Sequence, residues 1–310
     1  MTLPVKRKDR KNRLRRTMMF LSAQRPSLMK DAYVYRPDSV MFDLEDAVAE
    51  NQKDAARFSL YHVLRGVDYG DVERIVRING LDTPHWKEDV RAAVAGGADG
   101  IRIAKCESAG DVEAVEAAVE AAEREFSREK GETLLMAAIE SPRGLLNALP
   151  ICEASGRLFG VAISGGDFRK CMGTGYTPDG VEMAAARGNL LLAARAAGVQ
   201  CFDTVFTNLD DMEGFTAEVV MDKKMGFDGK SVISPRQIGV VHAVFAPTEK
   251  EIREAEKIVR AIRENAERGI GVFTVDGKML DIAFLPGAER TLALAKASGL
   301  YEEDMEGMEE

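Results

Sequence analysis

The chain has 310 residues, of which 45% are hydrophobic and 30% charged, so it can bury a large core, and parallel barrels of this length commonly form one domain. Its formal net charge of -9 argues against a nucleic acid as the principal partner. Because there is neither an apolar run of about 20 residues nor a signal-peptide segment near the start, we expect a cytoplasmic protein that is neither secreted nor membrane-spanning.

The cysteines and histidines restrict the compartment and the kind of metal site. The four cysteines show no CxxC pairing, which indicates reduced thiols in a reducing compartment: Cys106, Cys152, Cys171 and Cys201. The three histidines show neither an HxH nor an HExxH spacing, which excludes the usual zinc site: His62, His85 and His242. Any metal should therefore have oxygen ligands, and Mg²⁺ is favoured over Zn²⁺.

The predicted elements alternate along the chain. Residues 1–13 form a basic segment that we interpret as a flexible tail, with contact to a phosphate group as the alternative. Apolar runs that predict strands follow at residues 15–22, 39–48, 74–80, 100–108, 134–142, 158–167, 201–208 and 229–235. Helical periodicity is clearest at residues 53–66, 87–98, 110–126, 181–198 and 211–226, and several of these segments end in a glycine.

Short strands that alternate with helices predict parallel βαβ units. Over residues 14–246 they match an α/β protein of the (β/α)8 TIM-barrel class better than an open doubly wound sheet. No GxGxxG motif follows the first strand and no GxxxxGK[ST] motif occurs, so a nucleotide-binding sheet lacks its fingerprint. Residues 247–300 predict a helical C-terminal extension that packs on its own barrel or reaches a neighbouring subunit, and residues 301–310 an acidic tail.

Glu140 and Asp167 follow two consecutive apolar runs, LLMAAI and LFGVAI, where a parallel barrel aims its functional side chains into one pocket. Two carboxylates from adjacent strands, completed by water and substrate oxygens, are a familiar Mg²⁺ arrangement. The alternatives are that Glu140 caps the following helix and that Asp167 is a turn residue after two glycines. We favour the metal pair over either alternative taken singly.

Other charged residues at the predicted strand ends complete a candidate site. Arg77 is placed to bind a carboxylate or an oxyanion, with an internal salt bridge to Asp43 or Glu45 as the alternative or an addition. We interpret Glu45 as a supporting acceptor for Arg or Lys, and Asp46 likewise. Lys105 as a Schiff-base lysine is the less favoured reading, because the metal pair already supplies an electron sink. Further polar residues at these ends are Arg16, Asn79, Glu107 and Asp203.

Several motifs occur together in an order and spacing that resemble one family. They are residues 15–19, MFDLEDAV, VRING, AAIESPRG, FDTVF and GFDGKSVISPRQI, and the resemblance covers roughly residues 14–300. The chain is similar to the citrate lyase β subunit or citryl-CoA lyase family of the HpcH/HpaI aldolase superfamily, which includes malyl-CoA and citramalyl-CoA lyases. This resemblance implies a barrel with a C-terminal extension, a homotrimer or larger assembly, and an enzyme that splits or forms a C–C bond between a thioester and a 2-oxo acid.

The resemblance also implies roles for individual residues. Glu140 and Asp167 resemble the Mg²⁺ ligands, Arg77 the substrate-binding catalytic arginine, and Arg16 a second anion contact. Asp281 resembles an acid that the extension of an adjacent subunit supplies, although a turn residue after GKM is the alternative. With Glu45 as a supporting acid, these residues form the expected site, in which Glu140 also contacts the substrate.

The chain departs from the family pattern in its first, fourth and sixth strands. The first reads MMFLSAQRPS in place of a Pro-Gly turn, the fourth IRIAKCES in place of Leu-Pro-Lys, and the sixth SGGDF without an acid before Asp167. These departures leave the metal chemistry intact.

The resemblance as a whole implies a Mg²⁺-dependent carbon–carbon lyase for a citryl, citramalyl or malyl thioester, carried by CoA or an acyl-carrier protein. A mainly structural subunit of a citrate lyase-type complex and a pyruvate-class metal-dependent aldolase are the alternatives.

Overall fold

The computed structural model describes residue 11 and residues 13–301. Apart from residues 11, 13 and 301, the basic and acidic tails predicted at residues 1–13 and 301–310 lie outside the described residues. The chain divides into two compact units, Met1–Val241 and His242–Glu310. The predicted boundary between residues 246 and 247 lies a few residues after this division. It lies just after the end of the helix α11 (Pro235–Phe245), whereas the division falls within that helix.

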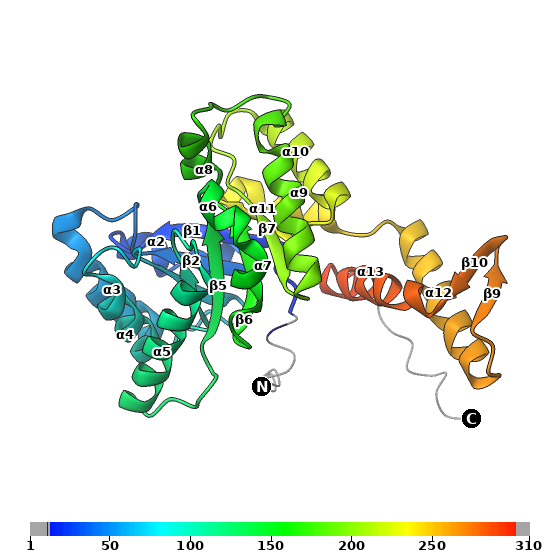
Figure 1. Cartoon of the computed structure of the whole chain (residues 1–310), viewed down its shortest axis with the longest axis horizontal. Helices are drawn as coiled ribbons and strands as arrows, with labels where there is room; N and C mark the ends of the chain where they lie inside the picture. Colours follow the sequence, from blue (N-terminus) through cyan, green and yellow to red (C-terminus); the bar gives the residue numbers. More distant parts are fainter. Residues whose placement is uncertain (1–10, 12, 302–310) are drawn as a thin grey trace. The chain divides into compact units, whose positions relative to one another are not determined.

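The first unit is a closed barrel of parallel strands in the order β1 to β8, and β8 pairs with β1 (Figure 1). This confirms the predicted (β/α)8 fold. The strands are β1 (Thr17–Ser22), β2 (Ser39–Asp43), β3 (Glu73–Ile78), β4 (Gly100–Ile103), β5 (Leu134–Ile139), β6 (Leu158–Ile163), β7 (Gln200–Asp203) and β8 (Gly229–Val232).

The helices of this unit follow the strands in sequence. They are α2 (Pro26–Met29), α3 (Lys53–Gly66), α4 (Trp86–Gly96), α5 (Ala109–Glu125), α6 (Pro142–Leu146), α7 (Ala148–Glu153), α8 (Gly165–Met172), α9 (Val181–Ala196), α10 (Met212–Met225) and α11, with short 3₁₀ turns at Ala32–Tyr35 and Glu50–Gln52. The five clearest predicted helices are α3, α4, α5, α9 and α10, each within a few residues of the expected bounds.

Apolar side chains explain why these segments form a barrel. Every residue of β2 and β6 is buried, as expected for strands covered on both faces. The barrel interior holds an apolar cluster that includes Met18, Met136 and Phe202. The seam of the barrel, where β8 pairs with β1, also requires a glycine, since a Cβ on Gly229 would collide with the carbonyl oxygen of Arg15.

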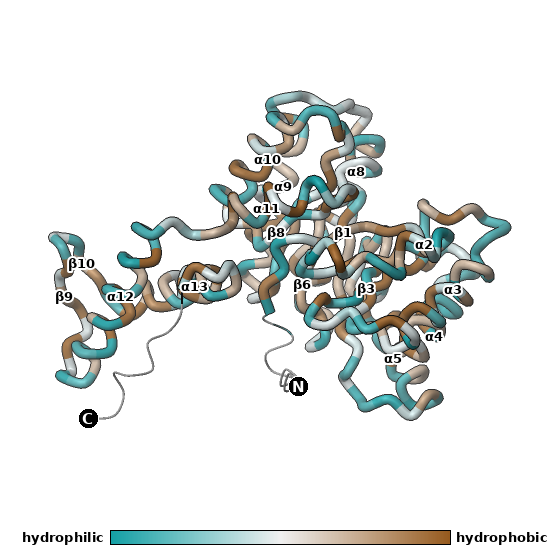
Figure 2. The backbone as a smooth tube through the Cα atoms, turned by 180° about the vertical axis from the view of Figure 1, so that it is seen from behind, coloured by the Kyte–Doolittle hydropathy of each residue, from teal (hydrophilic) through white to brown (hydrophobic). Residues whose placement is uncertain are grey.

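The second unit contains α12 (Glu249–Glu267), the antiparallel hairpin β9 (Val272–Val275) and β10 (Lys278–Asp281), a 3₁₀ turn (Ile282–Phe284) and α13 (Leu285–Ala297). Thr248 and Glu251 form a capping box at the start of α12. Its apolar face packs on α13 through Ala255, Val259 and Ala288, and hydrophobic and hydrophilic stretches alternate along this unit (Figure 2). Within the described residues, no helix has the length and apolar character of a membrane span.

Candidate active site

A pocket of about 810 Å³ opens at the C-terminal ends of the strands in the first unit. Its lining includes Lys105, Glu107, Glu140, Arg143, Asp167, Lys170 and Cys171. In barrels of this kind the catalytic residues lie at this end, because the loops that follow the strands meet there. The predicted metal pair thus lines one pocket.

Glu140 directly follows β5 and is 3% exposed. Its Oε1 accepts a hydrogen bond of 3.3 Å from the Ser164 hydroxyl, and its buried Oε2 has no hydrogen-bond partner in the structure. Burial raises the pKa of Glu140 to about 7; the nearby Glu45 adds to this rise, while Arg102 and Arg77 oppose it. The alternative that Glu140 caps the next helix is wrong, since Ser141 is the cap and accepts from the Gly144 N–H at 3.1 Å.

Asp167 lies in the first turn of α8, half-buried, and not in a turn after Gly165 and Gly166 as the alternative proposed. Gly165 starts the helix, and its N–H donates to the Thr204 hydroxyl at 2.8 Å. An acidic side chain is favoured at this end of a helix. The junction of β6 and α8 therefore presents Asp167 to the pocket that Glu140 lines.

The Glu140–Asp167 pair fits a hard divalent cation. Among the described residues there is no group of three or more His, Cys, Asp and Glu side chains that could hold a metal ion, and Glu140 and Asp167 are the two carboxylates that would hold a cation in this pocket. Mg²⁺ is commonly bound in this way, with its other positions left to water and substrate oxygens. The unpartnered, buried Oε2 of Glu140 is a ligand atom without another role.

Arg77, on β3, is held by two carboxylates beside this pair. Its Nε and Nη2 donate to the two oxygens of Asp43 at 2.7 and 2.6 Å, and its Nη1 lies 3.0 Å from Glu45. Burial alone would raise the pKa of Asp43, but the Arg77 guanidinium and backbone N–H donors lower it below its usual range. The internal salt bridge predicted as an alternative is thus present, and it fixes the guanidinium at the mouth of the barrel.

Lys105 follows β4 and lies 2.6 Å from Glu45 and 3.7 Å from Asp46. Burial lowers its pKa, but the hydrogen bond and charge of Glu45 outweigh this and raise it above the usual value. A lysine that stays protonated is a poor Schiff-base nucleophile, so the less favoured reading of Lys105 does not fit the structure. Glu45 bridges Arg77 and Lys105, as expected of a supporting acid.

The structure contradicts the prediction that Arg16 is an anion contact of the site. Arg16 precedes β1, at the opposite end of the barrel from Glu140, and its Nε and Nη2 both lie 2.9 Å from the carboxylate of Asp38. Of the other predicted strand-end residues, Glu107 lines the pocket, whereas Asp203 and Asn79 are structural. The Asp203 carboxylate is buried between Arg187 and Lys230, and Asn79 binds Lys53 and Asp89.

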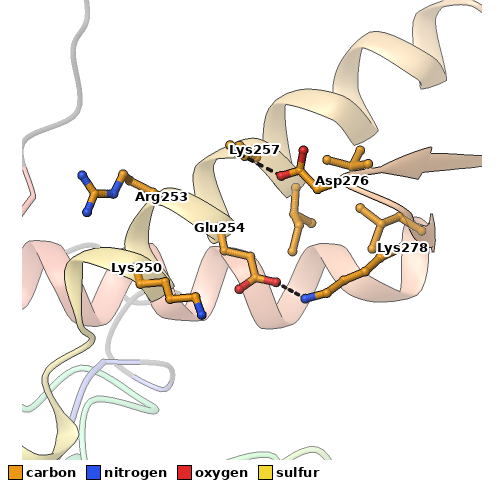
Figure 3. Close-up of a pocket in the computed structure, with 9 residues that line it drawn as sticks. Lys250, Arg253, Glu254, Lys257, Asp276 and Lys278 are labelled. Carbon is orange, nitrogen blue, oxygen red and sulfur yellow. Dashed lines mark hydrogen bonds and ion pairs between the residues drawn. The ribbon is translucent and has the colours of Figure 1, made fainter.

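Asp281 belongs to the second unit, at the end of β10, where its carboxylate accepts a hydrogen bond of 2.9 Å from the Ala283 N–H. Its predicted catalytic role stays a prediction. A second pocket of about 360 Å³ lies in the same unit, lined by Lys250, Arg253, Glu254, Lys257, Asp276 and Lys278 (Figure 3). Two ion pairs cross it, Lys257 with Asp276 at 2.8 Å and Lys278 with Glu254 at 2.5 Å, and none of the predicted site residues lines it.

The sequence interpretation missed Arg102, on β4. Arg102 is 2% exposed, and its Nη2 donates to the Ser164 hydroxyl at 2.8 Å. Ser164 in turn donates to Glu140, so one side chain bridges the two residues. Burial and the charge of Arg77 lower the pKa of Arg102 to about 10, which leaves it a cation at neutral pH. An arginine inside the otherwise apolar strand GIRI was the available signal.

Known proteins show which family the chain belongs to. The sequence model of the HpcH/HpaI aldolase/citrate lyase family matches residues 16–235, and that of a C–C bond lyase of the TIM-barrel fold matches residues 188–300. The citrate lyase subunit beta of Leuconostoc mesenteroides subsp. cremoris is 49% identical over 94% of this chain and 97% of its own length.

Two solved structures extend the comparison. Protein CitE from Mycobacterium tuberculosis, in complex with magnesium, acetoacetate and coenzyme A, superposes with a TM-score of 0.72 at 29% identity, covering 91% of this chain and 98% of that chain. The citrate lyase beta subunit from M. tuberculosis with oxaloacetate and magnesium superposes at 0.64 with 29% identity, covering 76% and 99%. The chain therefore belongs to the HpcH/HpaI aldolase/citrate lyase family and is a carbon–carbon lyase.

Proposed function

We propose that the chain is a Mg²⁺-dependent lyase that cleaves, or forms, a 3-hydroxyacyl thioester such as citryl-, citramalyl- or malyl-CoA. The products of cleavage are an acetyl thioester and a 2-oxo acid, which is oxaloacetate, pyruvate or glyoxylate respectively. The observation that carries this proposal is the pocket that Glu140 and Asp167 line together, with an unpartnered buried oxygen on Glu140. The relatives with magnesium, coenzyme A or oxaloacetate support the same chemistry.

The residues of this chain divide the reaction between them. Glu140 and Asp167 would hold Mg²⁺, which supplies Lewis-acid polarisation of the substrate oxygens when bound. In the cleavage direction the hydroxyl gives its proton to water, and its oxygen forms the carbonyl of the 2-oxo acid. The bond between that carbonyl carbon and the carbon next to the thioester breaks, and its electron pair forms the thioester enolate. Arg77 stabilises negative charge on the oxygen of the departing 2-oxo acid.

Asp43 and Glu45 act through Arg77. Two carboxylates on one guanidinium restrict its rotation, so the arginine needs little reorganisation when charge develops on the substrate. Glu45 also binds Lys105 at the rim of the pocket. We assign Glu45 a supporting role in catalysis for this reason.

Asp281 delivers the proton that converts the thioester enolate to the acetyl group. We propose that it acts in the site of an adjacent subunit, so that the enzyme works as a homo-oligomer, a trimer or larger, in the cytoplasm. Val272 and Met279 on the hairpin and Ile282 at the start of the following 3₁₀ turn are 58%, 71% and 64% exposed. Exposed apolar side chains around an acid are consistent with a surface that another subunit covers.

Mg²⁺ binding and thioester cleavage by the purified chain test this function. We expect Glu140→Gln and Asp167→Asn to lose Mg²⁺ affinity and turnover, while Asp82→Asn, another carboxylate of the same pocket outside the pair, keeps its Mg²⁺ affinity. Cleavage by the chain alone would exclude a mainly structural subunit, and a requirement for the thioester would exclude a pyruvate-class aldolase. Undiminished activity of Glu140→Gln would contradict the metal assignment.

A further inference from the structure

Arg102 is a buried cation without a counterion. It is 2% exposed, and among the described residues no carboxylate lies within ion-pair distance of it. Its Nη2 donates to Ser164, but its Nε and Nη1 are buried and have no hydrogen-bond partner. A guanidinium has five N–H donors, so most of the hydrogen-bonding capacity of this residue is unused.

The other buried arginines of the barrel unit show that this is exceptional. Each of them binds a carboxylate: Arg15 binds Glu73 at 2.6 Å, Arg16 binds Asp38 at 2.9 Å, Arg157 binds Glu123 at 2.8 Å and Arg187 binds Asp203 at 2.8 Å. An unpaired buried charge destabilises a folded protein. Such a charge is expected at a binding site, where a ligand of opposite charge compensates it. Arg102 does not itself line the pocket, but the Ser164 hydroxyl connects its guanidinium to Glu140, which does.

The position of Arg102 says which part of a ligand it meets. In the strand register Arg102 lies beside Arg77 and Met136, and Glu140 follows the end of β5, four residues after Met136. Met136 belongs to the apolar cluster of the barrel. Arg102 thus lies at the level of this cluster and donates to Ser164, whose hydroxyl in turn donates to Glu140.

The chemistry of the proposed reaction sets the orientation of the substrate, and the following inference rests on that proposed function. A thioester carrier is large and must enter from solvent. The 2-oxo acid would present its carboxylate and oxo group to the cation site of Glu140 and Asp167, so its remaining substituent would be directed away from the carrier, towards the barrel interior. That substituent is hydrogen in glyoxylate, methyl in pyruvate and a carboxymethyl group in oxaloacetate.

We propose that Arg102 binds the second carboxylate of a dicarboxylic 2-oxo acid and thereby selects the citryl over the citramalyl and malyl thioesters. Because no carboxylate of the described residues pairs with Arg102, the second carboxylate of the substrate supplies the missing negative charge. With pyruvate or glyoxylate its free N–H groups stay buried and unpaired. Sites built to hydrogen-bond a substrate group reject analogues that lack it, because the polar groups of the protein are left without a partner.

Calorimetric binding of oxaloacetate and pyruvate in the presence of Mg²⁺ tests this assignment without a turnover measurement. We expect the wild-type chain to bind oxaloacetate at least ~100-fold more tightly than pyruvate. We expect Arg102→Met to bring this ratio near one by weakening oxaloacetate alone, and Arg102→Lys to restore part of it. The wild-type ratio tests the proposal even if a variant does not fold.

Arg187→Lys is the matched control, because Arg187 is also buried but is paired with Asp203, whereas Arg102 is connected through Ser164 to Glu140. It should leave the ratio unchanged. Equal binding of both acids by the wild type, or equal weakening of both in Arg102→Met, would overturn the role of Arg102 while the lyase function stands. If the wild type binds neither acid and cleaves no thioester, the proposed function itself is wrong, and the assignment falls with it.

Discussion

At the scale of single residues, Glu140 combines two properties that link metal binding to pH. It is a proposed Mg²⁺ ligand, and burial raises its pKa to about 7. Below that pH the carboxylic acid must lose a proton before it can bind a cation, whereas above it the carboxylate is already present. Metal affinity should therefore increase as the pH rises through the neutral range.

We predict that Mg²⁺ binds about tenfold more tightly at pH 8 than at pH 6, because about a tenth of Glu140 is ionised at the lower pH and most of it at the higher. Isothermal titration of the substrate-free chain measures this ratio. In Asp167→Asn the affinity is lower at both pH values, but the ratio persists because Glu140 still titrates. The same affinity at pH 6 and pH 8 would contradict the role of Glu140.

Arg77 should not tolerate replacement by lysine. Arg77→Lys keeps the charge but loses the fork that binds both oxygens of Asp43, so the cation is no longer fixed beside the substrate oxygen. We predict a fall in kcat of at least ~100-fold with little change in Mg²⁺ affinity, measured by steady-state kinetics and calorimetry. A kcat within a few-fold of wild type would show that the fork has no catalytic importance.

The rule that strand ends carry function predicted part of the site. It identified Glu140 and Asp167, because each follows a buried strand. It was wrong for Arg16, because that residue precedes its strand and lies at the other end of the barrel. It passed over Arg102, since the strand register that brings this residue beside Arg77 is a tertiary property.

At the scale of elements, the long helices and the strands were predictable because their apolar periodicity is strong. The short helices α7 and α8 carry too few residues for a periodic signal and were not predicted as helices. The β9–β10 hairpin was also missed, although Asp276 and Gly277 at its turn have φ of 48° and 78°. An Asp-Gly pair between short apolar strands is a recognised hairpin signal, so this element was within reach.

The start of β8 depends on a glycine. We predict that Gly229→Ala destabilises the protein by about 1–3 kcal/mol, because the new methyl group meets the Arg15 carbonyl oxygen and the backbone must move. Chemical denaturation measures the change. Gly188→Ala, within α9 and with open space around its Cβ position, is the control, and it should stabilise by up to about 1 kcal/mol. Equal effects of the two substitutions would contradict the packing argument.

At the scale of the whole molecule, the barrel and the C-terminal unit carry different parts of the proposed site. Glu140 and Asp167 belong to the first unit and Asp281 to the second. If Asp281 serves an adjacent subunit, each active site is built from two chains, and activity depends on assembly. Family resemblance predicted this division, which no pattern within one chain could reveal.

We predict that Asp281→Asn and Glu140→Gln are each inactive, and that mixed oligomers of the two regain part of the activity. Some sites in such an oligomer combine an intact Glu140 from one subunit with an intact Asp281 from its neighbour. Cleavage assays after mixing and reassembly measure the recovery, with Asp276→Asn, an exposed acid of the same hairpin, as the active control. Absence of recovery in confirmed mixed oligomers would place Asp281 in its own subunit's site or outside the chemistry.

The seam of the barrel has a consequence for folding kinetics. Residues 17–19 on β1 pair with residues 230–232 on β8, so closure joins segments from opposite ends of the unit. Lys230, at this seam, binds Asp203, Glu218 and Asp222 from β7 and α10 within 3.0 Å. These side-chain contacts are local in sequence, whereas the β1–β8 pairing forms only after most of the chain is ordered, because the loop that it closes is long. Gly229→Ala, which disturbs this pairing through the Arg15 carbonyl oxygen, should therefore accelerate unfolding far more than it slows refolding, as stopped-flow kinetics would measure.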